Sequence, residues 1–442
     1  MRNHLHAAPL KSTTKWALTL ALSTAAAAVV IAPPAAGARA GAGAEAGAGA
    51  RPPCSPIAND KSAIGKTVDD TTAIGDTDTH DLANAFDLPD YRQLHRNAEA
   101  VSALGIPAVQ ARATTRQATC AARVGVADVR TGRAIPADGA FRIASTSKAF
   151  TATVVLQLVG EGRLQLDDRV ERWLPGVVAG RPITIRQLLQ HTAGLQDAIP
   201  TWNTKAEYLE MRYQRYSTEE LVAHGVALPQ LFEPGEGWAY SNTGYMIAEL
   251  LIERITGQPW DREFDRRIFR PLGMRHTYSP GTSPEIRLPH AKQYQRFDGE
   301  LVDVTSQIPA YAAGGIVSTT RDLDTFFRAL LGGRLLRPAE LSAMKTTRPV
   351  GPEIEPFWPD GRYGLGLVSR PLPGGGRYWG HDGGDSGSIV TVGVTEDGRR
   401  GAVVSMNFAL DGSMPETLSQ QRAADKVVTD ALRPPHQALS SD

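Results

Sequence analysis

The alternation of apolar and polar positions along the chain predicts two antiparallel hairpins. Between residues 387 and 408, apolar residues alternate with small or polar ones on both sides of Asp397–Gly398. A period of two lines one face of a strand with apolar side chains, and Asp-Gly is a preferred two-residue hairpin turn. A similar alternation in residues 123–135, around Thr131–Gly132, predicts a second hairpin.

Apolar residues at helical spacing predict helices through much of the remaining chain. This pattern occurs in residues 94–104, 150–158, 184–190, 218–226, 243–257, 321–333 and 415–432. The elements run from a strand and a helix through a helical middle to strands and a final helix. We therefore predict an α+β fold, an antiparallel β-sheet flanked by helices with a mostly helical second sub-domain. The sheet part spans about 86–165 and 291–432, and the helical insertion spans about 166–290.

The first 40 residues have the pattern of a secretory signal peptide. Three basic residues precede the apolar run 16–32, and Ala38–Arg39–Ala40 offers small residues at the usual cleavage spacing. The run is slightly shorter than the roughly 20 residues of a membrane span, although a retained anchor is the alternative. We expect a secreted, extracellular protein that has no membrane contact after the signal is cleaved.

The next 45 residues predict an arm with little structure of its own. Residues 41–53 are a Gly/Ala-rich linker, and the polar stretch up to residue 85 has few large apolar groups. The main folded domain is then expected over 86–432, with a tail at 433–442. The two cysteines, Cys54 and Cys120, could form one disulfide in an exported protein, or remain free thiols.

Composition and charge exclude some partners. The chain has 442 residues, 42% of them hydrophobic, which is enough for a large core. Outside the first 40 residues, 43 basic residues face 47 acidic ones. A mildly acidic body argues against nucleic acid or an anionic membrane as the main partner.

The stretch FRIASTSKAF, 141–150, places a serine and a lysine at the start of a predicted helix. Ser145 lies at or near the helix N-terminus, with Lys148 one turn later. Serine needs a base within hydrogen-bond reach to act as a nucleophile, and residues three apart share a helix face. Ser-x-x-Lys also occurs at Ser12 and Ser342, but only Ser145 follows a strand-like run. The spacing alone also fits an ordinary serine N-cap.

Two further motifs each occur once in the chain. Tyr240-x-Asn242 lies just before a predicted helix, and His381-x-Gly383 lies before the C-terminal hairpin. A phenol beside a lysine ammonium can relay a proton, and glycines at a strand edge allow a substrate backbone to approach. Taken singly, each motif also fits a structural role, such as a turn tyrosine with a capping asparagine or a histidine in a turn.

The three motifs, in this order, resemble those of the serine β-lactamase and penicillin-binding protein superfamily. The similarity is greatest to the branch of D-alanyl-D-alanine carboxypeptidases, which includes class C β-lactamases and related esterases. The stretches LLQHTAGL (188–195), IFRPLGM (268–274), AAGGIVST (312–319) and YGLGL (363–367) agree with it. The resemblance spans about residues 90–432 and implies a β-lactamase/transpeptidase-like fold.

The resemblance implies a covalent acyl-enzyme mechanism. Ser145 would attack the carbonyl of an amide, an ester or a β-lactam, and Tyr240 and Lys148 would share the role of general base. Asn242 would orient the substrate. His381 would help proton transfer or bind a carboxylate.

The resemblance also implies an oxyanion hole and no cofactor. The backbone N–H groups of Ser145 and Gly384 would form the hole, and Gly383 would lie beside the substrate. No metal or organic cofactor is implied.

The resemblance favours a D-alanyl-D-alanine carboxypeptidase that cleaves peptidoglycan-type stem peptides. Family esterases, D-amino-acid amidases and β-lactamases are alternatives, and a non-hydrolysing penicillin-binding sensor is an alternative of another class. The third motif departs from many carboxypeptidases, because Asp382 replaces Thr or Ser and Gly384–Asp385 follow it. Arg370 and Arg377 are candidates for binding a substrate carboxylate.

The sequence GDSGS, 384–388, offers a competing nucleophile. It resembles the stretch around the serine of trypsin-like proteases, which would make Ser386 the nucleophile. The chain lacks that family's histidine signature and disulfides. Asp-Ser-Gly before a strand is also ordinary turn chemistry, so we favour Ser145.

Overall fold

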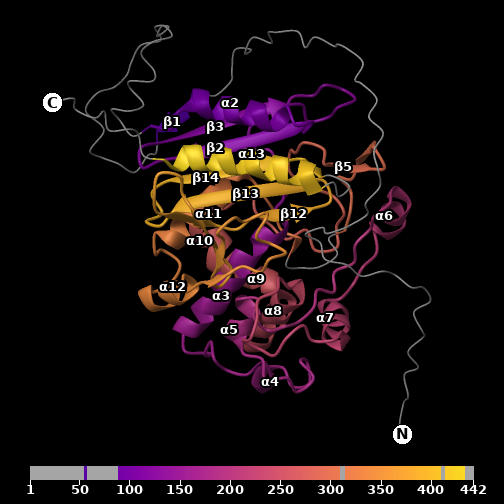
Figure 1. Cartoon of the computed structure of the whole chain (residues 1–442), viewed down its shortest axis with the longest axis vertical. Helices are drawn as coiled ribbons and strands as arrows, with labels where there is room; N and C mark the ends of the chain where they lie inside the picture. The colour runs from indigo at the N-terminus through magenta and orange to yellow at the C-terminus, as the bar shows by residue number, and fades with distance from the viewer. Residues whose placement is uncertain (1–53, 57–87, 309–313, 410–413, 434–442) are drawn as a thin grey trace, which may run out of the picture.

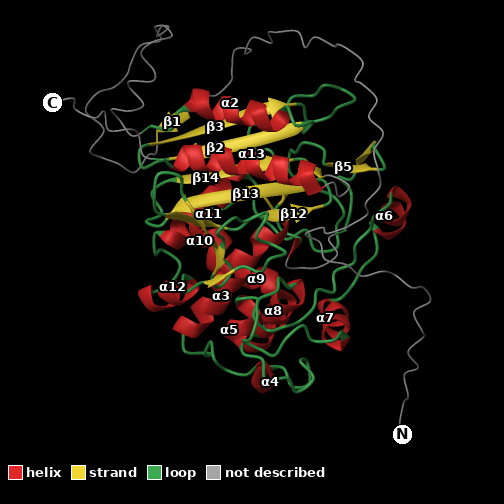
Figure 2. Cartoon of the chain, in the orientation of Figure 1, coloured by secondary structure: helices red, strands yellow, loops and turns green. Residues whose placement is uncertain are grey.

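The computed structural model describes residues 54–56, 88–308, 314–409 and 414–433. The predicted signal peptide, almost all of the predicted arm and all of the tail except Arg433 lie outside these ranges. A sheet covered by helices forms one part of the molecule, and a group of helices forms the other (Figure 1, Figure 2). The α+β architecture is therefore confirmed.

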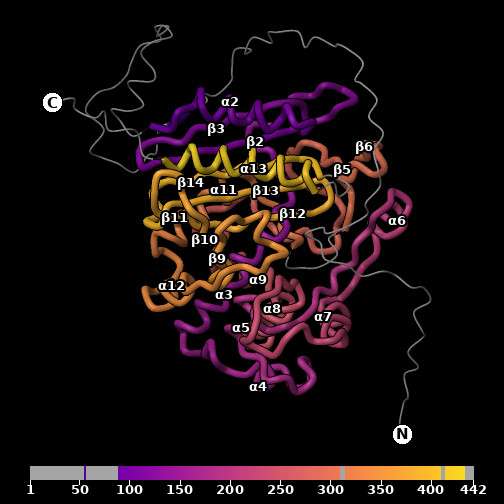
Figure 3. The backbone as a smooth tube through the Cα atoms, in the orientation of Figure 1, coloured from indigo at the N-terminus to yellow at the C-terminus, as the bar shows by residue number. Residues whose placement is uncertain are grey.

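The main sheet has ten strands, and neighbouring strands are antiparallel throughout. Their order is β1 (Cys54–Pro56), β3 (Ala118–Gly125), β2 (Ala108–Thr114), β14 (Gly401–Met406), β13 (Ser388–Thr395), β11 (Arg377–Gly380), β10 (Val368–Pro371), β9 (Arg362–Tyr363) and β8 (Arg348–Pro349), with β12 (Gly383–Asp385) also paired to β13. Two smaller sheets join β4 (Phe141–Arg142) to β7 (Val317–Ser318), and β15 (Phe408–Ala409) to β5 (Tyr294–Phe297) and β6 (Glu300–Asp303). The N- and C-terminal segments of the described chain therefore lie side by side in one sheet (Figure 3).

One predicted hairpin is confirmed and the other is wrong. Strands β13 and β14 pair on either side of Asp397–Gly398, as the alternation predicted. Residues 123–125 are the end of β3, and around Thr131–Gly132 there is an isolated antiparallel bridge between Asp128 and Arg133 instead of a pair of strands. The true hairpin joins β2 to β3. Every residue of β2 is buried, although its sequence AVQARAT alternates between apolar Val109, Ala111 and Ala113 and polar neighbours. The turn from β2 to β3, residues 115–117, contains no glycine, proline, asparagine or aspartate, so it lacked the turn signal that Thr131–Gly132 offered.

Helices cover both faces of the sheet. The helices α2 (Tyr91–Ser102) and α13 (Met414–Leu432) pack together on one face, and α11 (Thr320–Leu331) packs on the other. The pleat sends successive β14 residues to opposite cores: Val404 joins the core beneath α2 and α13, and Val403 joins the core beneath α11.

The helical part is built around a buried central helix, α3 (Ser147–Gly160). Around it lie η1 (Ala144–Thr146), α4 (Val170–Trp173), α5 (Ile185–Leu189), α6 (Lys205–Met211), α7 (Thr218–Ala227), α8 (Asn242–Thr256), α9 (Trp260–Phe264), the π-helical η2 (Asp265–Phe269), α10 (Arg270–Leu272) and α12 (Pro338–Met344). Phe150 of α3 stacks on Phe326 of α11, with ring centroids 3.7 Å apart. One continuous core therefore joins the helices to the sheet.

The two cysteines form a disulfide. Cys54 and Cys120 are bonded and are also facing partners in the β1–β3 ladder. The alternative of two free thiols is excluded, and the bridge pins residues of the predicted arm to the sheet edge. No helix within the described ranges is both long and apolar enough to cross a membrane.

Candidate active site

Ser145 lies in a strained turn that joins β4 to α3. The preceding Ile143 donates its backbone N–H to Ile316 O at 3.0 Å. Ala144 then has φ +46°, a left-handed conformation that is unfavourable for a residue with a Cβ. The turn is also tied to the third motif, because Thr146 Oγ1 donates to His381 O at 3.1 Å.

Lys148 connects the serine to the second motif. Its Nζ lies 3.1 Å from Ser145 Oγ and 2.5 Å from Asn242 Oδ1. The Lys148 side chain is fully buried, and this burial lowers its pKa to about 7, against the opposing charges of Asp197 and Glu249. An amine with this pKa is partly neutral near pH 7, which a proton acceptor for the serine requires.

Tyr240 lies against the same amine. Lys148 Nζ is 5.0 Å from the centroid of the Tyr240 ring and 5.5 Å from that of Tyr245. Helix α8 is capped by Ser241, whose Oγ accepts the N–H of Gly244 at 3.3 Å. Asn242 is therefore not the cap, and its side chain faces Lys148 instead.

His381 is buried and both of its ring nitrogens have partners. Nδ1 lies 2.6 Å from Asp382 O, and Nε2 lies 3.0 Å from the Tyr363 hydroxyl. A carbonyl only accepts, so Nδ1 carries the proton and Nε2 accepts from the phenol. Burial lowers the pKa of His381 to about 3. The imidazole is therefore neutral and supplies no positive charge to a substrate carboxylate.

The middle residue of the third motif points away from the serine. The Asp382 carboxylate accepts from Arg370 at 3.0 Å and from Trp358 Nε1 at 2.9 Å. Arg370 is itself buried and also binds Asp425 at 2.8 Å. Arg377 donates to Ser369 Oγ at 2.7 Å and to a backbone carbonyl. Neither arginine that the sequence suggested for a substrate carboxylate is available to the cleft.

The glycines of β12 lie next to the serine turn. A Cβ on Gly383 would lie 2.1 Å from Ile143 O, so only glycine allows this close packing. A Cβ on Gly384 would meet nothing within 4 Å, so open space lies in front of Gly384. Ser386 lies in the two-residue turn between β12 and β13, with Gly387 at φ +70°, and accepts from Trp202 Nε1 at 3.0 Å.

Three functional candidates were missed by the sequence prediction. The Asp197 carboxylate accepts from Asn242 Nδ2 at 2.5 Å. His191 Nδ1 accepts the backbone N–H of Ser241 at 3.1 Å, and burial holds its pKa well below the ordinary value. Glu249 is fully buried, and neither of its oxygens has a hydrogen-bond partner among the described residues. Only the family-like stretch 188–195 pointed to this region, and it ends two residues before Asp197.

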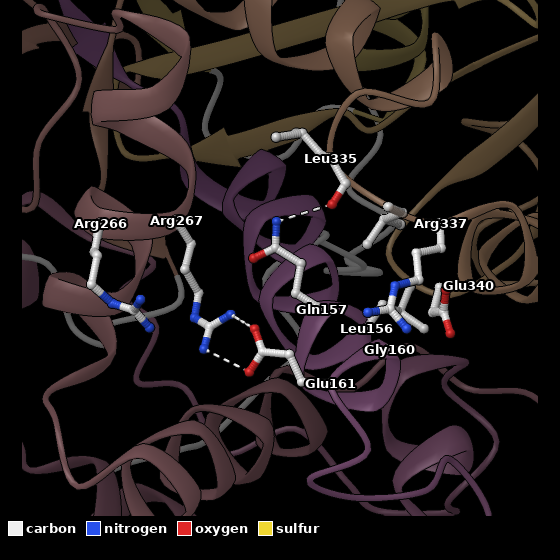
Figure 4. Close-up of a pocket in the computed structure, with 10 residues that line it drawn as sticks. Leu156, Gln157, Gly160, Glu161, Arg266, Arg267, Leu335, Arg337 and Glu340 are labelled. Carbon is white, nitrogen blue, oxygen red and sulfur yellow. Dashed lines mark hydrogen bonds and ion pairs between the residues drawn. The ribbon is translucent and has the colours of Figure 1, made fainter.

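A separate cavity lies at the C-terminal end of α3, whose N-terminal end follows Ser145. It has a volume of about 330 Å³ and is lined by Gln157 and Gly160 of α3 with charged residues of η2 and α12 (Figure 4). Twelve residues of helix, about 18 Å, separate Gly160 from Lys148. The cavity is therefore distinct from the serine cleft. No cluster of three or more His, Cys, Asp or Glu residues that could hold a metal ion occurs in the described ranges.

The fold and the ordered motifs define a hydrolase of the class that comprises serine β-lactamases and penicillin-binding proteins. The Beta-lactamase family model matches residues 94–425, and the chain belongs to this family.

Known proteins with similar sequence or structure agree with this assignment. Penicillin-binding protein 4* of Bacillus subtilis is 32% identical over 278 residues, which cover 59% of this chain and 59% of that protein. The chain therefore matches less than two thirds of this relative. A D-stereospecific amidohydrolase from Streptomyces sp. is 37% identical, with a TM-score of 0.67 over 75% of this chain and 98% of that structure. The D-amino acid amidase of Ochrobactrum anthropi SV3 is 28% identical, with a TM-score of 0.66 over 77% and 97%.

Proposed function

We propose that the protein is a serine hydrolase that forms an acyl-enzyme on Ser145. The hydrogen-bonded chain from Ser145 through Lys148 to Asn242 carries this proposal. Lys148, with Tyr240 beside it, accepts the Ser145 proton as Oγ bonds to the substrate carbonyl carbon. The resulting oxyanion lies between the backbone N–H groups of Ser145 and Gly384, and each such donor contributes about 10²–10³ in rate.

The second half of the reaction releases the products. The leaving amine or alcohol takes the proton from the Lys148–Tyr240 pair as its bond to carbon breaks. Water then attacks the acyl ester, its proton passes to the same pair, and Ser145 Oγ is restored. Asn242 holds the lysine in place during both halves, and His381 supports the cleft as a neutral group.

For the substrate, we propose amides of D-amino acids. A carboxypeptidase must hold a terminal carboxylate, but Arg370 and Arg377 are engaged and His381 is neutral. Asp197 accepts a hydrogen bond from Asn242, so its carboxylate adds negative charge near the place where a substrate carboxylate would lie. Similarity to a D-stereospecific amidohydrolase supports the same substrate class. Cleavage of D-alanyl-D-alanine termini is the second candidate, supported by the similarity to a penicillin-binding protein.

We also propose that the protein is exported. The predicted signal peptide at residues 1–40 and the Cys54–Cys120 disulfide support this, because disulfides form and persist in oxidising compartments.

A kinetic panel on the purified protein tests the activity. D-alaninamide and its L-enantiomer, acetyl-lysyl-D-Ala-D-Ala, a p-nitrophenyl ester and nitrocefin would be compared for wild type, Ser145→Ala and Ser386→Ala. We expect turnover of the D-amide that disappears only with Ser145→Ala. Turnover that survives Ser145→Ala would refute the acyl-enzyme on this serine. Labelling by a fluorescent penicillin without release would indicate a sensor instead.

A further inference from the structure

On the basis of the acyl-enzyme function proposed above, we propose that Asp197 is a positioning residue. It fixes the side-chain amide of Asn242 and thereby directs the Lys148 amine toward Ser145. Asp197 lies outside the three motifs and reaches the serine only through two other side chains.

The hydrogen-bond chain shows how Asp197 acts. An asparagine side chain has an accepting oxygen and a donating nitrogen, and an ionised carboxylate only accepts. Asp197 Oδ2 therefore faces Asn242 Nδ2, at 2.5 Å, which leaves Asn242 Oδ1 to face Lys148 Nζ, also at 2.5 Å. A reversed amide would place its oxygen against the carboxylate and its NH₂ against the amine, so the carboxylate excludes this orientation.

The segment that carries Asp197 is held firmly against α8. The carbonyl of Gln196 accepts from Thr243 Oγ1 at 2.7 Å, and Asp197 Oδ1 accepts the N–H of Ile199 at 3.3 Å. Just before it, Gly194 has φ +72°, and a Cβ there would lie 2.1 Å from Phe232 O. The carboxylate is thus placed before substrate arrives, as an orienting group requires.

Asp197 also influences the charge of the lysine. Its negative charge is the largest effect that raises the pKa of Lys148 against burial, while burial raises the pKa of Asp197 itself. Five other titratable groups interact with Lys148 or lie against its amine: Tyr240, Tyr245, Glu249, His191 and His381. Of these, His381 and His191 are neutral through burial, and Glu249 has its pKa raised well above the ordinary value.

Two substitutions separate the orienting role from a structural one. Asp197→Asn can still accept from Asn242 through its own Oδ1 but carries no charge, whereas Asp197→Ala has no acceptor. We expect Asp197→Ala to lower kcat/KM by about tenfold to a hundredfold, the effect of losing one charged hydrogen bond. We expect Asp197→Asn to stay within about threefold at its optimum and to move the acid limb of the pH profile down by about 0.5–1 unit.

Thr243→Val provides the matched control. It removes the hydroxyl that holds Gln196 O but leaves the Asp197 carboxylate in place, so any loss should come without a shift of the acid limb. All variants would be assayed on a substrate that wild type hydrolyses and Ser145→Ala does not. Failure of the proposed function would therefore appear in Ser145→Ala, and failure of the Asp197 role only in the Asp197 variants.

Clear outcomes would overturn the proposal. Wild-type kcat/KM in Asp197→Ala would show that the carboxylate does not orient the site. If Asp197→Asn lost as much activity as Asp197→Ala, with the acid limb unmoved, the role would be structural only. If Asp197→Ala failed to fold, Asp197→Asn alone would test the proposal: an acid limb at lower pH would support it, and an unmoved acid limb would contradict it.

Discussion

The Tyr363 hydroxyl donates a hydrogen bond to His381 Nε2, at 3.0 Å. The Asp382 carbonyl fixes the tautomer of the third-motif histidine, because Nδ1 must donate to it, and the Tyr363 hydroxyl then donates to the unprotonated Nε2. Tyr363 belongs to the stretch YGLGL, for which the sequence offered only a family likeness. In the structure, Tyr363 of this stretch binds the histidine, and Gly366 packs closely against Lys148 and Ala152 of α3.

Tyr363→Phe should destabilise the protein while preserving its shape. The buried Nε2 would lose its donor, and an unsatisfied buried acceptor costs about 1–3 kcal/mol. Urea unfolding would measure the loss. Tyr213→Phe is the control, since Tyr213 is exposed and its hydroxyl contacts Ser306 Oγ at 3.2 Å. Equal stability of the two variants would contradict the importance of the Tyr363–His381 bond.

Activity should rise with pH through the titration of Lys148. Its pKa is lowered to about 7, so the amine is protonated and inactive as a base below this pH and neutral above it. A plot of kcat/KM against pH should therefore show an acid limb near pH 7.

Lys148→Arg should lower kcat/KM by about 10²–10⁴-fold, because a guanidinium stays protonated at all working pH values. Lys345→Arg is a matched control from the Ser-x-x-Lys match at Ser342, since the half-buried Lys345 amine binds the exposed Glu396 at 2.7 Å. Retention of activity in Lys148→Arg would exclude the lysine as the base.

Glu249→Gln should change how stability depends on pH. Burial raises the pKa of Glu249 well above its ordinary value, so the folded protein holds a proton that the unfolded chain releases above about pH 4.3. The free energy of unfolding of wild type should fall as pH rises above this value, by up to about 1.4 kcal/mol per unit. The variant should lose this dependence. If the free energies of unfolding of wild type and Glu249→Gln changed in parallel from pH 5 to 8, Glu249 would have an ordinary pKa in the folded protein.

Gly366→Ala should damage the serine helix. A Cβ at Gly366 would lie 2.6 Å from Ala152 Cβ and 2.9 Å from Lys148 O. Gly374→Ala is the matched control, because both glycines have positive φ but nothing lies within 4 Å of a Cβ at Gly374. Both variants bear a backbone strain of about 1–2 kcal/mol, and overpacking should cost Gly366→Ala a further 1–3 kcal/mol or so.

Thermal unfolding and kcat would be measured for both glycine variants. We expect the melting temperature and kcat to fall further in Gly366→Ala. A similar kcat in the two variants would show that the segment around Gly366 does not control the position of Lys148.

The structure places Ser145, Lys148 and Asn242 in a single hydrogen-bonded chain, as the sequence predicted. Ser145 and Lys148 meet because they are one helical turn apart, whereas the contact between Lys148 and Asn242 spans 94 positions and was expected only from the family resemblance. The hairpin predicted at 123–135 failed because the true turn, residues 115–117 between β2 and β3, has no glycine, proline, asparagine or aspartate, whereas Thr131–Gly132 offered a typical turn. Asp197 could not be predicted, since its contact with Asn242 leaves no local pattern and Asp197 lies outside the three motifs and the family-like stretches.

Arg370, held between Asp382 and Asp425, has a consequence for how the cleft is assembled. Asp425 and Gln421 belong to α13, so the third motif is supported by a helix that follows β14 in the sequence and lies outside all three motifs. A nascent chain that has only reached β14 contains every motif but leaves the buried guanidinium with one counter-ion instead of two. The three motifs are therefore not sufficient to complete the cleft, because the charge balance beneath the third motif depends on a helix that carries none of them.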